Sequence, residues 1–234
     1  MGTKYNPRIV STGLTVYLDS ANTRSYAGSG FTVNPLVGGI GGTLVNGIGF
    51  SSQNSGSFFY DGSDDYLRLP ANFFNPDSGT PFTVSVWFKT GTSGMILGQE
   101  NGATPGSGTG WVPAIYVDTN GKIRTSCFWG GSTTNQSTSS ASVNDNLWHQ
   151  ILVTFESTSH KSYLDGVLFD TITKTQTSYS ATYYYYLGSG KITSWPNAGN
   201  MTLSGNISNF LFYNRALTAQ EILINYNANK MRYI

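Results

Sequence analysis

Apolar residues recur at every second position along most of the chain, and short clusters of Gly, Asn, Asp and Ser interrupt them. Phe82–Thr90 (FTVSVWFKT) shows the pattern clearly, and so do Leu14–Ser20 and Gly205–Leu217. Strict alternation between turn signals is typical of half-buried β-strands. The sequence shows no linker and no second core, so we expect one all-β domain over residues 1–234, with residues 1–12 as an N-terminal arm.

Turn residues indicate where these strands reverse. Asn46-Gly47, Asn120-Gly121 and Asp165-Gly166 each stand between two alternating segments, and such dipeptides favour the tight turns of β-hairpins. Two stretches without apolar periodicity, Gly102–Gly110 and Gly130–Ser142, are expected to be surface loops.

Only the C-terminal end predicts a helix. Thr218 and Glu221 match the capping box T-x-x-E, and Leu217 and Ile222 occupy the two positions of a hydrophobic staple. We therefore expect one short amphipathic helix over Ala219–Lys230.

Charge and cysteine content exclude several classes of function. Charged residues make up 11% of the chain, aromatic residues 14%, and the net charge is +1. No run of Lys or Arg indicates nucleic-acid binding, and no apolar stretch approaches the roughly 20 residues that a membrane-spanning helix needs. The single Cys127 cannot form an intrachain disulfide. The N-terminus lacks the apolar core of a secretory signal, so we expect no export by that route.

Three segments, in this order, resemble the laminin G-like and pentraxin-like branch of the concanavalin A-like lectin/glucanase superfamily. They are Phe82–Thr90, then Leu147–Gln150 (LWHQ) with Tyr163–Gly166 (YLDG), then Gly205–Ile222. Gly13–Tyr26 with Gly56–Leu67 is similar to a variant common in phage and environmental bacterial proteins. The resemblance covers about residues 13–228. It implies a jelly-roll-like sandwich of two curved antiparallel sheets with one short C-terminal helix, and a rim that binds glycans or proteins, often through calcium.

Glycoside hydrolysis needs two carboxylates that flank one bond. The glucanase branch of the superfamily carries them as Glu-x-Asp-x-Glu, a triplet that this sequence lacks. The closely spaced acids Asp61, Asp64 and Asp65 surround Gly62, which is ordinary turn chemistry. Neither histidine suggests a nucleophilic triad, since His149 lies in the structural LWHQ pattern. We expect no enzymatic activity.

Calcium binding is the main cofactor question. The resemblance to pentraxins aligns Glu100 and Asn101 with an acid–amide pair of calcium ligands, but it places Ser189 and Lys191 where a second acidic cluster should be. The double calcium site is therefore expected to be lost. Two alternatives remain. Either Glu100 or Asp118 holds a single calcium ion together with backbone carbonyls, or the chain has no cofactor and these acids are solvated rim residues.

Aromatic residues supply the candidate glycan contacts. In a strand, Tyr183 and Tyr185 share one face while Tyr184 and Tyr186 share the other, so Tyr184 and Tyr186 can form a pair that stacks on a sugar. The same tyrosines suit a contact between subunits or a purely structural role. Three further aromatic residues lie near loops: Trp111, Trp129 and Trp195. Each could stack on a sugar or could fill the apolar space beneath its loop.

The leading hypothesis is a non-catalytic structural protein of a virion, either a capsid decoration or a tail or fibre component, assembled in the host cytoplasm. Its lectin-like domain would face cell-surface glycans, and its termini (residues 1–9 and 228–234) would contact neighbouring copies or other virion proteins. The alternative is a carbohydrate-binding lectin-like protein that acts alone in a bacterium, and a glycoside hydrolase comes third. The virion hypothesis rests on analogy with the family.

Overall fold

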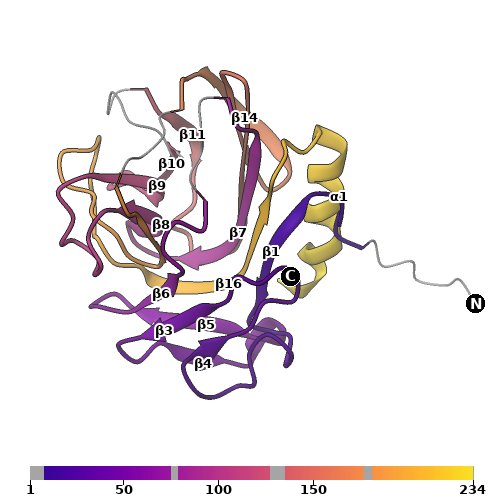
Figure 1. Cartoon of the computed structure of the whole chain (residues 1–234), viewed down its shortest axis with the longest axis vertical. Helices are drawn as coiled ribbons and strands as arrows, with labels where there is room; N and C mark the ends of the chain where they lie inside the picture. Colours follow the sequence, from indigo (N-terminus) through magenta and orange to yellow (C-terminus); the bar gives the residue numbers. More distant parts are fainter. Residues whose placement is uncertain (1–7, 75–78, 127–134, 177–180, 234) are drawn as a thin grey trace, which may run out of the picture.

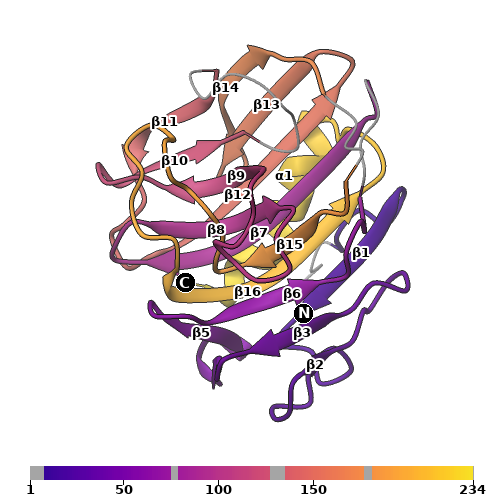
Figure 2. The same ribbon diagram turned by 60° about the vertical axis from the view of Figure 1, so that its left-hand side comes forward.

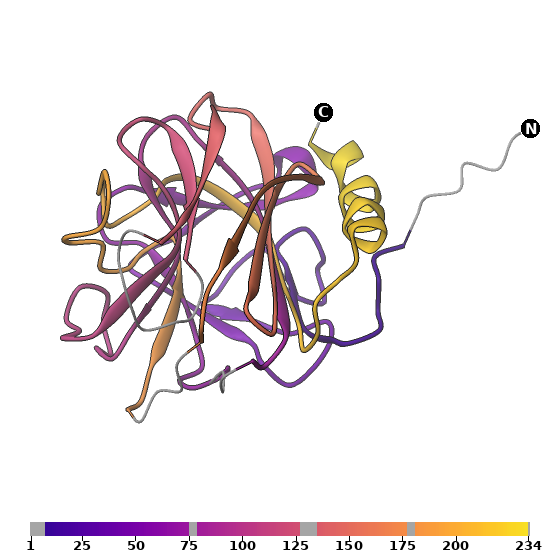
Figure 3. The ribbon, with the colours of Figure 1, turned by 90° about the horizontal axis from the view of Figure 1, so that it is seen from above.

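A computed structural model describes residues 8–74, 79–126, 135–176 and 181–233. Two antiparallel sheets of eight strands each pack face to face, and one helix lies outside them near the C-terminus (Figures 1 and 3). The expected all-β sandwich with one C-terminal helix is confirmed. No helix in these ranges has the length and apolar character needed to cross a membrane.

We call the sheet beside the helix sheet A. Its strands run in the order β14 (Val167–Thr173), β13 (Ser159–Leu164), β12 (Trp148–Glu156), β7 (Phe82–Thr90), β16 (Ser204–Tyr213), β5 (Ser57–Asp61) and β4 (Gly49–Ser51), and β1 (Leu14–Asp19) also pairs with β16.

The opposite sheet is sheet B. Its strands run in the order β11 (Ser137–Ser142), β10 (Lys122–Thr125), β9 (Trp111–Val117), β8 (Gly94–Glu100), β15 (Tyr184–Leu187), β6 (Tyr66–Leu69), β3 (Gly42–Val45) and β2 (Thr32–Val33).

The core fills the space between the two sheets. Phe88 and Phe210 reach into it from sheet A, and Ile115 and Tyr185 reach into it from sheet B, all nearly without exposure to solvent. The period-two pattern produces this arrangement, because alternate side chains of each strand point to the same face.

The helix α1 (Ala219–Asn229) begins at the predicted capping box. The Thr218 side chain accepts a hydrogen bond from the Glu221 backbone N–H, and the Glu221 side chain accepts one from the Thr218 backbone N–H. Leu217 and Ile222 are both buried in a second apolar cluster, against the outer face of sheet A. The short 3₁₀ helix η2 (Lys230–Arg232) follows directly.

The C-terminal end packs on its own domain. Trp87 of β7 stacks on Tyr226 and on Tyr233, with ring centroids 5.6 and 4.2 Å apart. Arg232 forms an ion pair with Asp19 of β1 at 3.1 Å. Tyr233 and Arg232, which belong to the predicted intersubunit contact, are therefore engaged within the chain, and contact with neighbouring copies stays a prediction. Residues 1–7 and 234 lie outside the described ranges.

Two of the three expected hairpins are confirmed. Asn120-Gly121 joins the paired strands β9 and β10, and Asp165-Gly166 joins β13 and β14. The third was wrong: Asn46-Gly47 carries the chain from β3 in sheet B to β4 in sheet A, so the flanking strands do not pair. Both turn residues adopt the left-handed conformation that the dipeptide favours (φ 66° and 98°), but that local geometry does not determine which sheet the next strand joins.

One expected loop also contains a strand. Residues 137–142, within the predicted loop Gly130–Ser142, form the edge strand β11 beside β10. This strand consists of Ser, Thr and Ala, so it carries no apolar periodicity from which it could have been predicted. Burial alternates along its first residues all the same, but in polar side chains. Ser137 and Ser139 are buried, and the Ser139 hydroxyl accepts a hydrogen bond from the Ile123 N–H.

Candidate functional site

The outer face of sheet B, which points away from the core, carries a line of side chains across four strands. The pairing register sets Thr32 opposite Thr43, Thr43 opposite Arg68, and Arg68 opposite Tyr186. Directly opposed residues of antiparallel strands share a face. The line therefore runs from the edge strand β2 through β3 and β6 to β15 (Figure 2).

Two loops cover the other half of this face. Residues 188–203, which follow β15, fold over β8 and β9 and bury Ile192 and Trp195 against Met95, Val112 and Tyr116. Residues 101–110 join β8 to β9, and the Tyr186 hydroxyl donates a hydrogen bond of 2.7 Å to the carbonyl of Gly102 in this loop. We call residues 101–110 the first covering loop and residues 188–203 the second covering loop.

The half that the covering loops leave open forms a hollow of about 670 Å³, which we call the outer groove. Its floor is made by β2, β3, β6 and β15, and its walls by the loops that follow β2 and β6. The volume lies in the range of ligand sites, about 300–1,000 Å³. Its lining residues are Thr32–Pro35, Gly39, Gly41–Thr43, Arg68–Ala71 and Tyr184.

The outer groove combines one aromatic ring with polar side chains that are free to bind a ligand. Tyr184 is half-buried on the floor, while Thr32, Asn34, Thr43 and Arg68 are exposed. Within the described part of the chain, no hydrogen bond engages the side chains of these four exposed residues. A ring beside unengaged hydroxyl, amide and guanidinium groups suits a ligand that has both apolar and hydroxylated faces.

The tyrosine run alternates between the faces as predicted, but its outward pair does not form a platform of two rings. Tyr185 lies in the core and Tyr186 is fully buried on the other face. Tyr186 meets the Tyr66 ring edge to face at 5.3 Å and is sealed by the first covering loop. Burial, with a smaller contribution from the Glu100 charge, raises the pKa of Tyr186. Tyr184 alone of the pair is open to the outer groove.

The loop tryptophans that the structure describes lie under the covering loops. Trp195 is 8% exposed within the apolar cluster that the second covering loop makes. Trp111 packs on the same cluster, and the Lys191 ammonium lies 4.2 Å from the centre of its ring. Both arrangements favour the apolar-plug interpretation over a sugar platform. Trp129 and Cys127 lie outside the described residues.

Glu100 and Asn101 hold the first covering loop in place, and Glu100 also binds the second. The fully buried Glu100 carboxylate accepts hydrogen bonds from the backbone N–H groups of Gly106, Gly108 and Lys191 at 2.9 to 3.2 Å. The Asn101 side-chain oxygen accepts from the N–H groups of Thr109 and Gly110. An ion at Glu100 would have to displace three such donors, so these residues do not fit a calcium site in this conformation.

Asp118 anchors a different loop, at the far end of the same pair of strands. One carboxylate oxygen accepts from the N–H groups of Asn120 and Lys122, and the other meets Arg124 at 2.6 Å. Burial raises the pKa of Asp118, but the hydrogen bonds from Arg124 and the turn outweigh it and hold the pKa below its ordinary value. The length of β8, about 20 Å, separates Asp118 from Glu100, so the two alternative metal ligands lie at opposite ends of this strand.

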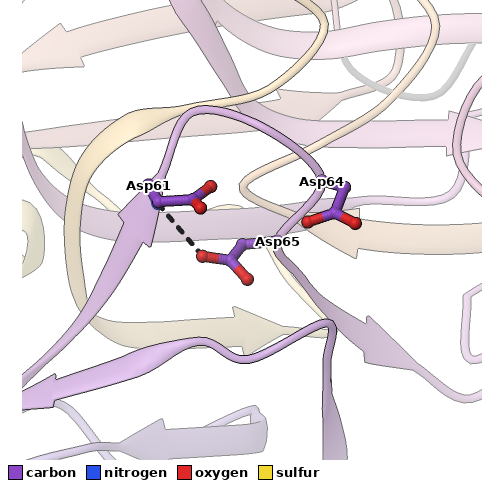
Figure 4. A group of neighbouring side chains, drawn as sticks. All are labelled: Asp61, Asp64 and Asp65. Carbon is purple, nitrogen blue, oxygen red and sulfur yellow. Dashed lines mark hydrogen bonds between the residues drawn. The ribbon is translucent and has the colours of Figure 1, made fainter.

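The three acids of the turn between β5 and β6 lie close together (Figure 4). Asp61, Asp64 and Asp65 each place one carboxylate oxygen within 4.8 Å of the others. The buried Asp65 accepts a hydrogen bond from the Asp61 N–H, and Asp61 accepts one from the Ser63 N–H. Burial and the two neighbouring charges raise the pKa of Asp65, against the effect of that backbone bond. These bonds lie within the turn and match the turn chemistry expected from the sequence.

Reasoning from the sequence found Tyr184 but missed Arg68, Thr32 and Thr43. One signal was available: Arg68 occupies an outward position in the otherwise apolar strand Tyr66–Leu69. What no pattern revealed is the strand order that places β2 and β3 beside β6, because it depends on pairings between distant segments.

A family model described as the concanavalin A-like lectin/glucanases superfamily, of the laminin G type, matches residues 61–223. The chain belongs to this superfamily. The matched residues include every strand from β6 to β16 and therefore most of sheet B, which carries the outer groove. No curated protein matches the sequence.

Solved structures with the same fold include two proteins in complex with carbohydrates. Trypanosoma rangeli sialidase in complex with sialic acid matches with a TM-score of 0.66 and 15% identity, over 97% of this chain and 34% of the sialidase. The chain thus spans about a third of that enzyme. Domain 4 of AbnA, an extracellular arabinanase from Geobacillus stearothermophilus, in complex with arabinotriose, matches with a TM-score of 0.63 and 17% identity, over 90% of this chain and 96% of that domain.

A third match is the binding domain of Paraclostridial Mosquitocidal Protein 1, with a TM-score of 0.60 and 14% identity, over 93% of this chain and 52% of that one. At these identities the three likenesses show a shared fold and nothing about the ligand of this chain.

Proposed function

We propose that this chain is a non-catalytic carbohydrate-binding domain and that a glycan occupies the outer groove. The observation that carries the proposal is the half-buried Tyr184 ring on the floor of a hollow whose other polar side chains are unengaged. Apolar sugar faces stack on such rings, and hydroxyl, amide and guanidinium groups at the edge bind sugar hydroxyls. The arabinotriose complex of the similar arabinanase domain supports this proposal by analogy alone.

The chemistry of the groove supports binding without hydrolysis. Hydrolysis needs an acid and a second carboxylate across the scissile bond. No Asp or Glu is among the described residues that line the outer groove. Glu100 lies on the same face of sheet B, but its carboxylate is buried and committed to the first covering loop.

Tyr184→Ala tests the proposal on an array of neutral and acidic glycans. We expect the wild-type chain to bind one class of glycan, and we expect the variant to bind it at least about tenfold more weakly, a loss of about 1.4 kcal/mol. Phe59→Ala is the matched control, because it removes an exposed ring from sheet A without touching the groove. Wild-type affinity in Tyr184→Ala, or a loss in Phe59→Ala alone, would reject the outer groove as the site.

We retain the virion role as the larger setting of this domain, with a lectin that acts alone as the alternative. Its support is the resemblance of Gly13–Tyr26 and Gly56–Leu67 to a variant common in phage and environmental bacterial proteins. The native mass, measured with and without a chelator, separates the two. A stable oligomer indifferent to the chelator favours the virion role, whereas a monomer favours the solitary lectin, with calcium involved if chelation lowers its melting temperature.

A further inference from the structure

Arg68 differs from Arg124, which also lies on a strand of sheet B, in having no acidic partner among the residues that the structure describes. Arg124 pairs with Asp118 at 2.6 Å, and at the helix-covered side Arg215 pairs with Glu221 at 2.6 Å. Arg68 forms no ion pair and no side-chain hydrogen bond within the described residues, although it lies on an interior strand of its sheet. Its guanidinium is exposed to the outer groove.

The surroundings of Arg68 leave its charge without a local counterion. It is the single charged side chain among the described residues lining the groove. Its cross-strand neighbours are the neutral Thr43 and Tyr186. The acid directly opposite Tyr184, Glu100, is sealed beneath the first covering loop and accepts three backbone hydrogen bonds.

A guanidinium in a hollow has specific requirements of a ligand. It presents five N–H donors in a planar fork that matches carboxylate and sulfate groups, and it cannot lose its proton at physiological pH. Bonds of this kind are about twice as strong as those between neutral groups. The walls of a groove exclude part of the solvent, which strengthens the attraction further.

Building on the proposed function, we propose that the glycan bound in the outer groove is anionic, with Arg68 holding its carboxylate or sulfate group while Tyr184 supports a sugar ring. Residues 32 and 43, both threonine, continue the line from Arg68 to the sheet edge and supply hydroxyls for the neighbouring sugar. The preference for a charged ligand follows from Arg68, and the preference for a sugar follows from Tyr184.

The test uses two pairs of probes, each pair sharing one backbone. Oligogalacturonate is compared with its neutral methyl ester, and a κ-carrageenan oligosaccharide with its desulfated form, by titration calorimetry at low and high salt. We expect the acidic member of one pair to bind at least tenfold more tightly than its neutral counterpart, and the advantage to shrink as salt rises. The pair that shows the advantage distinguishes a carboxylate from a sulfate ligand.

Arg68→Gln then removes the charge, and Arg8→Gln removes an exposed arginine near the N-terminus as a control for net charge. We expect Arg68→Gln to abolish the advantage of the acidic probe while Arg8→Gln keeps it, and both variants to melt like the wild type. Arg68→Lys should recover part of the advantage, since it keeps the charge but not the fork.

Failure of this inference is distinct from failure of the proposed function. If the glycan array returns only neutral ligands, or Arg68→Gln leaves the ratio of acidic to neutral affinity unchanged, the anionic ligand is rejected while carbohydrate binding stands. If Tyr184→Ala has no effect on any glycan bound, or no glycan binds, the outer groove is not a glycan site and both proposals fall.

Discussion

At the scale of single residues, the structure separates side chains that hold loops from side chains that are free to bind. The resemblance implied Glu100 or Asp118 as a metal ligand, but backbone N–H groups of nearby loops already bind both carboxylates, and Arg124 also pairs with Asp118. The sequence could suggest which residues carry useful oxygen atoms. It could not show that those atoms are already engaged, because the donors are brought to them by the folded loops and strands.

His149 gives the molecule a pH-dependent contact. Its ring nitrogens meet Asp165 at 2.8 Å and Asp145 at 3.2 Å. Burial lowers the pKa of His149, but the two carboxylates outweigh it, so that the net pKa is raised. A raised pKa in the folded state means that the contribution to stability is complete below the ordinary value of about 6.5 and is lost as pH rises through the folded value.

We therefore expect the free energy of unfolding to decline as pH rises from about 6.5 through the raised pKa of His149. His149→Gln should remove this decline, because glutamine does not titrate. Urea unfolding of the wild type and the variant at a series of pH values measures this decline. The buried His160 is present in both proteins and stays neutral. An identical pH profile in the variant would show that the ion pairs with Asp145 and Asp165 contribute nothing.

At the scale of elements, local signals were reliable and long-range ones were not. The capping box at Thr218 and the turn at Asp165-Gly166 involve neighbouring residues, so the sequence determines them directly. Asn46-Gly47 has the correct turn chemistry, but whether the next strand pairs with the previous one depends on competition among many strands. The same limit concealed the edge strand β11.

The docking of α1 on sheet A provides a test at this scale. Thr218→Ala removes the N-cap and should lower the free energy of unfolding by about 1 kcal/mol. Ile222→Ala leaves a cavity in the apolar cluster and should cost about 2–4 kcal/mol. Chemical unfolding measures both, with the exposed Leu223→Ala as the control that should change little. Equal costs for Ile222→Ala and Leu223→Ala would contradict this packing.

At the scale of the whole molecule, the two faces of the sandwich have different roles. The helix and the C-terminal residues cover sheet A, with Trp87 stacked against Tyr226 and Tyr233. The covering loops occupy only part of sheet B and leave the outer groove open. The strand pattern and the resemblance predicted the sandwich. The groove could not be predicted, because its position follows from which part of the sheet the loops leave bare.

The most direct test of a glycan site in the outer groove is amide hydrogen exchange with and without the glycan that binds best on the array. We expect slower exchange on binding in residues 32–43 and 68–71, which contain most of the groove's floor and walls, and unchanged exchange in α1. Protection confined to residues 101–110 and 188–203 would place the ligand on the covering loops instead and would contradict a glycan site in the outer groove.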